Sequence, residues 1–228
     1  MAQKPSGRSR KGSSRAARGA RPRPSAQPPD PRQRAVAAAL RLAAVRDGWR
    51  RLSLAAIAHE AGLSLAELRR AVPSKQAILA AFLTEIDAQV LAAGQVDADE
   101  SARDRLFEVV MRRFDALAPY KDAVAAIVRD AGTDPMTLLA LGPPFLYGMA
   151  WMVEAAHLSS SGLQGLVRTN VLACVYAGAF RTWLADDSSD LSRTMAALDR
   201  GLRRVQRLCE MVCPGRTSGA ASKAAAAS

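Results

Sequence analysis

Residues 54–72 read LAAIAHEAGLSLAELRRAV, and this stretch decides the fold of the 228-residue chain. It predicts two short helices joined by a tight turn at residues 61–63. The turn needs a residue that accepts a positive φ, which Gly62 supplies, and two steeply crossing helices need a small residue where they approach, which Ala58 supplies. Three apolar side chains should point inward and hold the pair together: Ile57, Leu63 and Leu68.

This geometry is that of a helix-turn-helix, whose second helix offers its outer face to a DNA major groove. A plain pair of antiparallel helices has the same local pattern, so the flanking residues matter. Ser53 and Ser64 can cap the two helices, and Pro73 ends the second. Ser74 can cap a further helix from residue 75 to about 91. A helix should also precede the motif, beginning near Pro31 with Asp30 as its N-cap and ending before Gly48.

The remaining chain is also predicted to be helical, because Ala and Leu dominate its apolar residues and aromatic residues make up only 5% of the chain. Residues 94–101 form a linker. Helices are then expected at about 102–118, 121–131, 135–141, 145–158, 163–185 and 190–213. Gly142-Pro143-Pro144 should separate two of them, and the polar run 186–189 should separate the last pair.

The net charge of +11 is concentrated at the N-terminus, where residues 1–30 hold eight of the 32 basic residues and one acidic residue. This segment and residues 214–228 have too few large apolar side chains to order themselves, so both are expected to be disordered tails. A basic tail either binds polyphosphate or serves as a soluble leader.

Several classes of protein fit poorly. Three cysteines without framework spacing indicate reduced thiols packed in the core, with no metal site. No run of about 18 consecutive apolar residues is found, and no signal sequence, so a cytoplasmic location is expected. The chain has two histidines, no phosphate-binding loop and no nucleophile motif. We therefore expect neither an enzyme nor a cofactor. The acidic run at 186–190 is better explained as a helix-capping turn.

Residues 34–82 resemble the N-terminal domain of TetR-family transcriptional regulators. The resemblance lies in Gly48-Trp49 after the first helix, the turn at residues 61–64 and Pro73-Ser74-Lys75 at the start of the fourth helix. It implies an all-α, TetR-like fold with a three-helix DNA-binding domain at 31–82 and a helical ligand-binding and dimerisation domain at 83–213.

The resemblance also implies a set of DNA contacts on a palindromic operator. Phosphates would meet Ser53, Lys75 and the amides at the starts of their helices, with Arg69 and Arg70 along the groove wall. The groove itself would face Ser64, Leu65, Ala66 and Glu67. The alternative for the two arginines is a solvated helix face.

Two positions depart from the family pattern. The family usually carries Tyr and His where this chain has Arg69 and Ala71. Arg69 can still bind phosphate, whereas Ala71 cannot. Glu67 adds a negative charge to the reading helix, which is tolerable if it accepts a hydrogen bond from cytosine.

Apolar faces on the later helices predict a core, part of which would form the pocket for a small apolar effector. The residues expected to line that pocket are Val110, Phe114, Phe145, Met149, Met152, Tyr176 and Phe180. His157 is the one polar candidate in this region, although a satisfied or solvent-facing His is the simpler interpretation.

The last helix has a narrow apolar seam flanked by arginines: Leu191, Met195, Leu198, Leu202, Val205 and Cys209. The seam could close the body, pair two subunits or lie on an anionic membrane. A homodimer is favoured, because two recognition helices need a two-fold axis to read a palindrome.

Residues 183–200, WLADDSSDLSRTMAALDR, are also similar to the end of a second family. Its members are lipid-binding accessory proteins of ubiquinone biosynthesis, which share the TetR fold and do not regulate transcription. In that alternative the last helix docks on the membrane surface and the pocket holds a lipid.

Overall fold

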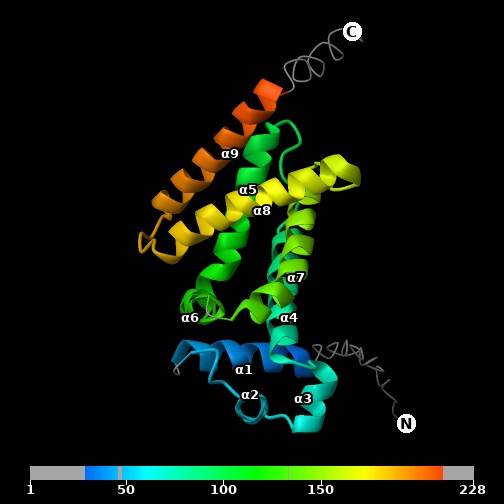
Figure 1. Cartoon of the computed structure of the whole chain (residues 1–228), viewed down its shortest axis with the longest axis vertical. Coiled ribbons are helices and arrows are strands. Elements are labelled where there is room, and N and C mark those ends of the chain that lie inside the picture. The colour runs from blue at the N-terminus through cyan, green and yellow to red at the C-terminus, as the bar shows by residue number, and fades with distance from the viewer. Residues whose placement is uncertain (1–28, 46–47, 133, 213–228) are drawn as a thin grey trace, which may run out of the picture.

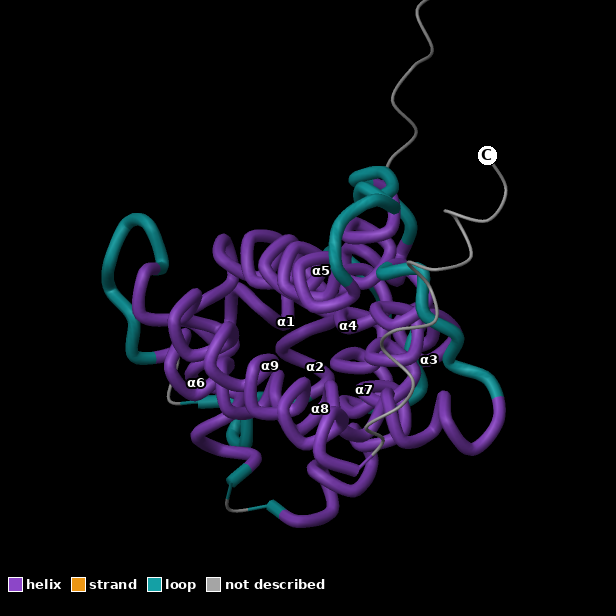
Figure 2. Tube along the Cα trace, turned by 90° about the horizontal axis from the view of Figure 1, so that it is seen from above, coloured by secondary structure: helices purple, strands orange, loops and turns teal. Residues whose placement is uncertain are grey.

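The computed structural model describes residues 29–45, 48–132 and 134–212, and these ranges are built of helices and loops without a strand (Figure 2). The all-α prediction is therefore confirmed for this part of the chain. The predicted C-terminal tail and all but the last two residues of the predicted N-terminal tail lie outside the described residues.

The helix-turn-helix lies at one end of the molecule (Figure 1). It comprises α2 (Leu54–Ala61) and α3 (Leu65–Ala71), and α1 (Pro31–Val45) packs against both of them. Asp30 accepts a hydrogen bond from the Arg32 backbone N–H at 3.3 Å, as predicted for the first cap. Three alanines of α1 are completely buried, and their small side chains let the neighbouring helices approach closely: Ala35, Ala38 and Ala39.

The body is joined to this end by α4 (Lys75–Ala92), which runs from α3 into the body beside α7 (Figure 1). The other body elements are α5 (Ala102–Leu117), the 3₁₀ turn η1 (Ala118–Tyr120), α6 (Lys121–Ala131), α7 (Pro135–Ala155), α8 (Gly162–Leu184) and α9 (Ser192–Val212). Helix α6 packs against α1, which gives the body a second connection to the helix-turn-helix.

The two helices predicted at 135–141 and 145–158 are one helix, α7, which continues through Pro143 and Pro144. That prediction was wrong. Proline removes a backbone donor and crowds the residue before it, but Gly142 has no Cβ to be crowded. Packing of α7 against α4 and α8 stabilises the helix around the interruption.

Helix α7 also has the length and composition of a membrane span, with a mean hydropathy of 1.4 and 28% of the apolar window buried. The expectation of no long apolar segment missed it, because Gly, Pro and Thr interrupt its apolar run. Helix α7 packs against α4 and α8, while most of its apolar window is not buried within the described part of the chain.

The acidic run before α9 is a capping structure, as predicted, although Asp186 is buried rather than solvated. Its Oδ2 accepts hydrogen bonds from the backbone N–H and hydroxyl of Thr194 at 2.9 and 2.7 Å. Its Oδ1 accepts from the Ser188 hydroxyl at 2.5 Å. Hydrogen bonds from Ser188 and Thr194 hold the pKa of Asp186 far below its ordinary value. The segment therefore fixes the start of α9.

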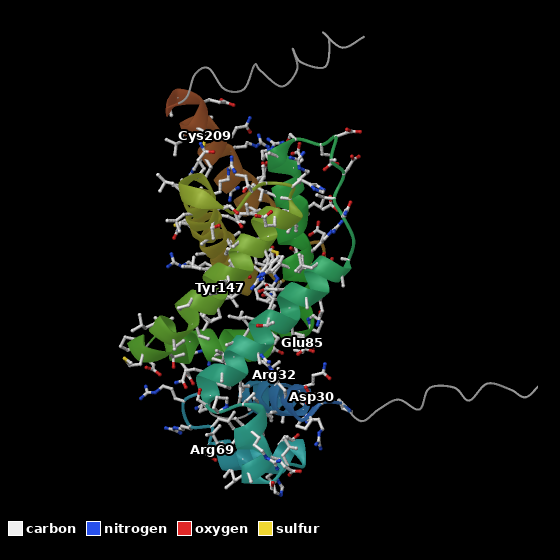
Figure 3. The ribbon with its side chains drawn as sticks, turned by 90° about the vertical axis from the view of Figure 1, so that its right-hand side faces the viewer. Asp30, Arg32, Arg69, Glu85, Tyr147 and Cys209 are labelled. Carbon is white, nitrogen blue, oxygen red and sulfur yellow. The ribbon has the colours of Figure 1, made fainter. Side chains whose placement is uncertain are left out.

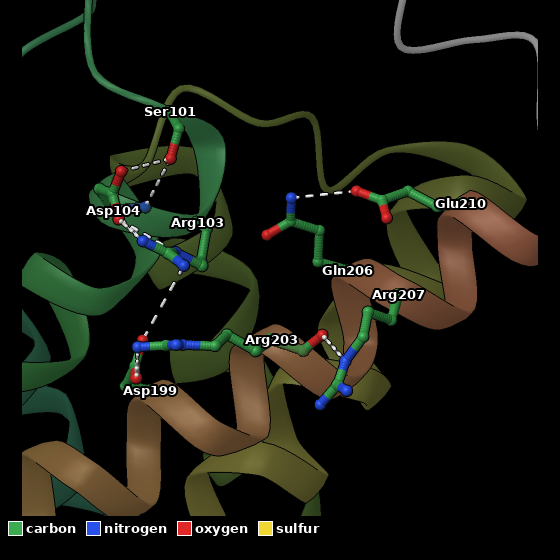
Figure 4. A network of polar contacts seen from close by, with 8 residues as sticks. All are labelled: Ser101, Arg103, Asp104, Asp199, Arg203, Gln206, Arg207 and Glu210. Carbon is green, nitrogen blue, oxygen red and sulfur yellow. Dashed lines mark hydrogen bonds and ion pairs between the residues drawn. The ribbon is translucent and has the colours of Figure 1, made fainter.

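The predicted seam of α9 closes the body over the first half of the helix, where Leu198 and Leu202 are buried against α8 and α5. Asp199 pairs with Arg203 at 2.5 Å and with Arg103 of α5 at 4.0 Å (Figure 4). Toward its end the seam is exposed, and so is Cys209.

The prediction that the cysteines pack in the core was wrong for Cys174 and Cys209, which are both exposed. Each lies on the outward side of its helix, away from the positions buried nearby. Cys213 lies outside the described residues.

Candidate nucleic-acid interface and ligand cavity

The turn between α2 and α3 has the predicted geometry. Gly62 is left-handed, with φ 63° and ψ 39°, and its N–H bonds to the His59 carbonyl at 3.1 Å. The next residue, Leu63, donates to the Ala58 carbonyl at 2.9 Å. These two hydrogen bonds end α2 and redirect the chain at once into α3. Ile57, Leu63 and Leu68 are all buried, which confirms that they lock the pair from inside.

Helix α3 is held by a capping box. The backbone N–H of Glu67 donates to the Ser64 hydroxyl at 3.2 Å, and the Glu67 carboxylate accepts from the Ser64 backbone N–H at 2.8 Å and from its hydroxyl at 2.7 Å. These bonds lower the pKa of Glu67 and occupy one of its oxygens. Glu67 thus has a structural role that the sequence analysis missed, although the Ser-x-x-Glu spacing was the signal for it.

Five of the seven residues of α3 are exposed, Ala71 is half-buried and Leu68 is buried. Arg69 projects at the helix-turn-helix end of the molecule (Figure 3). Arg70 is exposed on the same helix, and its Nε donates to the Ala66 carbonyl at 3.3 Å. Leu65, 59% exposed, lies in the first turn of α3. The exposed surface is therefore basic at its end and apolar at its start.

Ser53 and Lys75 differ in how freely they could meet phosphate. The Ser53 hydroxyl caps α2 by accepting from the Ala56 backbone N–H at 3.1 Å, and the residue is exposed. The Lys75 ammonium is half-buried, donates to the Trp49 carbonyl at 2.6 Å and lies 4.8 Å from the centre of the Trp49 ring. Desolvation lowers the pKa of Lys75. The Lys75 ammonium therefore holds the loop after α1 through its contacts with Trp49.

Two further groups brace this end of the molecule. Arg34 of α1 donates to the carbonyls of Ala61 and Gly62, both at 3.4 Å. Asp130 of α6 accepts from the Arg50 backbone N–H at 2.8 Å, and a Cβ at Gly48 would stand 2.5 Å from the same carboxylate. These contacts join residues far apart in sequence, so no local pattern could have revealed them.

An apolar cavity of about 220 Å³ lies inside the body, between α4, α5, α6, α7 and α8. Its aromatic wall is continuous: Tyr176 stacks on Phe180 with ring centres 5.7 Å apart and lies 5.6 Å from Phe145. Arg113 is the one charged side chain among its lining residues. The full lining is Leu79, Phe82, Leu83, Arg113, Leu117, Val124, Ile127, Val128, Leu141, Phe145, Tyr176, Ala177 and Phe180.

The predicted pocket residues divide into two groups. Phe145, Tyr176 and Phe180 line the cavity. Four others are fully buried in the surrounding core and are not among its lining residues: Val110, Phe114, Met149 and Met152. His157 is exposed, with Nε2 3.4 Å from the Val96 carbonyl, and is also absent from the lining. The walls from α4 and α6 were missed, because helix periodicity shows which residues are buried but not which helices meet.

A buried ion pair stands beside the cavity. Arg113 of α5, 1% exposed, pairs through Nη1 with Oδ1 of Asp87 on α4, whose side chain is 11% exposed. The guanidinium carbon lies 5.5 Å from the centre of the Tyr176 ring. Among the described residues, Nε of Arg113 has no hydrogen-bond partner. The ion pair therefore lies behind an apolar wall, and Nε and Nη1 of Arg113 have almost no accessible surface.

An exposed apolar surface covers the outer faces of α7 and α8, which pack against each other. Tyr147 of α7 is 74% exposed and projects from the body (Figure 3). The large apolar residues exposed on the two helices include Leu139, Tyr147, Trp151, Leu163, Leu166 and Val167. Apolar surface gathered in this way is typical of a contact with another molecule.

The arrangement matches solved structures over most of its length. A TetR transcriptional regulator from Nitrosomonas europaea ATCC 19718 matches with a TM-score of 0.62 at 22% identity, covering 77% of this chain and 97% of that one. One from Rhodococcus sp. RHA1 gives 0.58 at 19% identity, covering 77% and 95%. A TetR-family regulator from Streptomyces coelicolor gives 0.50 at 17% identity, covering 82% and 93%.

The chain has the fold of the TetR regulators. No family model and no curated protein matches it in sequence. At identities of 17 to 22% the solved structures establish the architecture alone, and DNA, effector and partner must be argued from this chain's own residues. The TetR fold covers both the helix-turn-helix and the body, since each match spans more than three quarters of the chain.

Proposed function

We propose that this chain is a DNA-binding transcriptional repressor that acts in the cytoplasm as a homodimer and responds to a small apolar effector. One observation carries the proposal. Helix α3 stands outside the molecule with Arg69 and Arg70 exposed, on a turn and a capping box that fix its direction. A short exposed helix of this kind is what enters a major groove, and exposed arginines bind phosphates on either side.

The body supports control by a ligand. Helix α4 begins at Lys75, which holds the loop after α1, and further along it contributes Leu79, Phe82 and Leu83 to the cavity wall. A molecule that filled the cavity would therefore press on the same helix that positions the DNA-binding end. The cavity and the DNA-binding end would then be coupled through α4 alone, without a chain of intermediate residues.

The exposed face of α7 and α8 supports the dimer. In the α9 seam, Leu198 and Leu202 are already buried within the subunit, whereas Tyr147 and Val167 are exposed and not covered by described residues. Replacing both by Asp should convert a dimer to a monomer in sedimentation velocity. A wild-type chain that sediments as a monomer at micromolar concentration would contradict the proposed pairing.

The DNA-binding proposal is tested with the chain's own upstream region. Purified protein should shift a palindromic fragment of that region, and the affinity should fall steeply as salt rises, because phosphate contacts release counterions. Arg69→Ala should weaken the shift by about tenfold and flatten the salt dependence. Arg200→Ala, which removes the same charge from an exposed position on α9, is the matched control and should bind as the wild type does.

One observation favours the lipid-binding accessory protein as a second candidate. The end of α9 carries Leu208 and Met211, 56% and 70% exposed, beside Arg204 and Arg207. Apolar side chains flanked by arginines suit an anionic membrane surface. The similar segment 183–200 is weaker support, because Asp186, Ser188 and Thr194 are accounted for by capping.

Flotation separates the two candidates. Under the second, wild-type protein co-floats with vesicles of phosphatidylcholine and phosphatidylglycerol, Leu208→Asp does not, and neither shifts the upstream fragment. Under the first, the fragment is shifted and Leu208→Asp leaves that shift unchanged, since α9 lies at the far end of the molecule from α3 (Figure 1).

A further inference from the structure

We infer that the cavity selects a small aromatic hydrocarbon, of one or two rings, that carries no hydrogen-bonding group. The inference rests on the effector site of the proposed repressor and specifies its ligand class. It depends on three features of the site: a wall with almost no polar surface, polar groups behind that wall that already engage one another, and a volume that limits the size of the ligand.

The wall offers a ligand almost no polar surface. Apart from Arg113 and the Tyr176 hydroxyl, every lining side chain is a hydrocarbon. The lining residues that reach the outside of the molecule are apolar too, since Val128 of α6 is 39% exposed and Ala177 of α8 is exposed. A ligand would therefore meet hydrocarbon at the outer side of the cavity as well as inside it.

The polar atoms of Arg113 and Tyr176 contact each other and Asp87 rather than the cavity. Arg113 pairs with Asp87, and its Nε and Nη1 have almost no accessible surface. Burial raises the pKa of Tyr176, while the charge of Arg113 and a hydrogen bond from its guanidinium to the hydroxyl oppose that rise. A carbonyl or hydroxyl group on the ligand would therefore lose its hydration in the cavity and gain no partner.

Charged ligands are excluded more strongly. Asp87 and Arg113 neutralise each other, so neither side chain is left to balance a charge on the ligand. A carboxylate or an ammonium group would have to give up its water without gaining an opposite charge. The pair therefore discriminates against acids and amines, although it lies behind the wall.

The volume and the rings of the cavity set the shape of the ligand. A dry apolar cavity of about 150 Å³ holds one benzene ring. This cavity, of about 220 Å³, has room for a ring with a short alkyl group or for two fused rings. The Phe180 ring lies at 20° to the Tyr176 ring and the Phe145 ring at 51° to it, so the wall presents both ring faces and edges. Such surfaces pack closely against another flat ring.

Three probes of similar size test the inference on the full-length protein. Cumene, acetophenone and benzoate carry a hydrocarbon, a ketone and a carboxylate branch on the same benzene ring. Octanol offers acetophenone a hydrogen-bond donor, which a dry apolar wall does not. In isothermal titration calorimetry the ratio of cumene affinity to acetophenone affinity should therefore exceed the ratio of their octanol–water partition coefficients by about tenfold. Benzoate should bind most weakly of the three.

The variant Leu83→Gln assigns the preference to the wall. Leu83 lines the cavity from α4 and is half-buried, so an amide placed there can reach both water and the ligand. It supplies the donor that the wild-type wall lacks, and the ratio of cumene to acetophenone affinity should fall by about tenfold. Leu139→Gln is the matched control, because Leu139 is 70% exposed on α7 and does not line the cavity. It should leave the ratio unchanged, and thermal melts check that both variants are folded.

The inference is overturned by a wild-type ratio no larger than the partition ratio, by benzoate that binds as tightly as acetophenone, or by no binding of any probe. A ratio that is unchanged in folded Leu83→Gln, or that falls equally in Leu139→Gln, also overturns it. If Leu83→Gln does not fold, the wild-type ratio alone decides.

The proposed repressor can fail separately. Operator binding is measured on the same preparation without any probe. If the upstream fragment is shifted and the hydrocarbon preference does not exceed the partition ratio, the ligand class is wrong and the repressor stands. If that preference is found and no fragment is shifted, the cavity is assigned correctly and the DNA-binding proposal is wrong.

Discussion

The turn between α2 and α3 and the cavity of the body are built from contacts of different range. At the turn, the hydrogen bonds join residues three to five positions apart, such as Ser64 with Glu67 and Leu63 with Ala58. At the cavity, Arg113 of α5 meets Asp87 of α4 and Tyr176 of α8. A short sequence window therefore contains the first site almost whole and the second not at all.

The largest effect is expected from breaking the long-range contact. Arg113→Met alone leaves the Asp87 carboxylate buried without its cation, which should cost about 3–5 kcal/mol of folding free energy. The double variant that also carries Asp87→Leu should recover most of that loss. Urea unfolding followed by circular dichroism measures both. A single variant as stable as the wild type would show that the pair is not buried in solution.

The contrast explains what could be predicted from sequence. Gly62, the serine caps and the inward positions of α2 and α3 follow from local rules, and the structure has them as expected. The Ser-x-x-Glu box at Ser64 belongs to the same class and was recognisable. Proline rules misplaced a break in α7, because packing against other helices outweighed a local signal.

The cavity shows the opposite limit. Helical periodicity marked Phe114, Met149 and Met152 as apolar and buried, which they are. It could not separate core from cavity wall, since that depends on which helices meet. Leu79 of α4 and Ile127 of α6 belong to the cavity wall, but the sequence patterns of their helices do not distinguish them from ordinary core residues.

The next effect concerns the positive φ at the turn. Gly62→Val places a β-branched residue at φ 63°, which should cost about 1–2 kcal/mol and misdirect α3, so operator binding should be lost. Gly94→Val is the matched control, because Gly94 has φ 94° with open space around it and lies in the linker between α4 and α5. The control should lose similar stability and keep its DNA affinity, measured by gel shift.

A smaller effect is expected from the cap of α3. Ser64→Ala removes the acceptor for the Glu67 backbone N–H and should cost about 1 kcal/mol. Ser101→Ala removes an equivalent cap at the start of α5, where Asp104 donates to the Ser101 hydroxyl at 3.2 Å. Both variants should melt earlier, while only Ser64→Ala should weaken operator binding. Equal weakening by both would mean that local order at α3 is not what the operator reads.

The smallest effect separates the two roles of Glu67. Gln can also complete a capping box, so Glu67→Gln should leave the melting temperature nearly unchanged. It removes a negative charge from an exposed helix that is proposed to lie against phosphates, and the operator affinity should rise by about threefold at low salt. The gain should shrink as salt rises, because added ions screen an exposed charge.

A fall in affinity would instead mean that the Glu67 carboxylate itself accepts a hydrogen bond from a base, since the amide is the poorer acceptor of a cytosine amine. Either result, read in a gel shift across a salt series, says whether this side chain serves the helix alone or also the DNA.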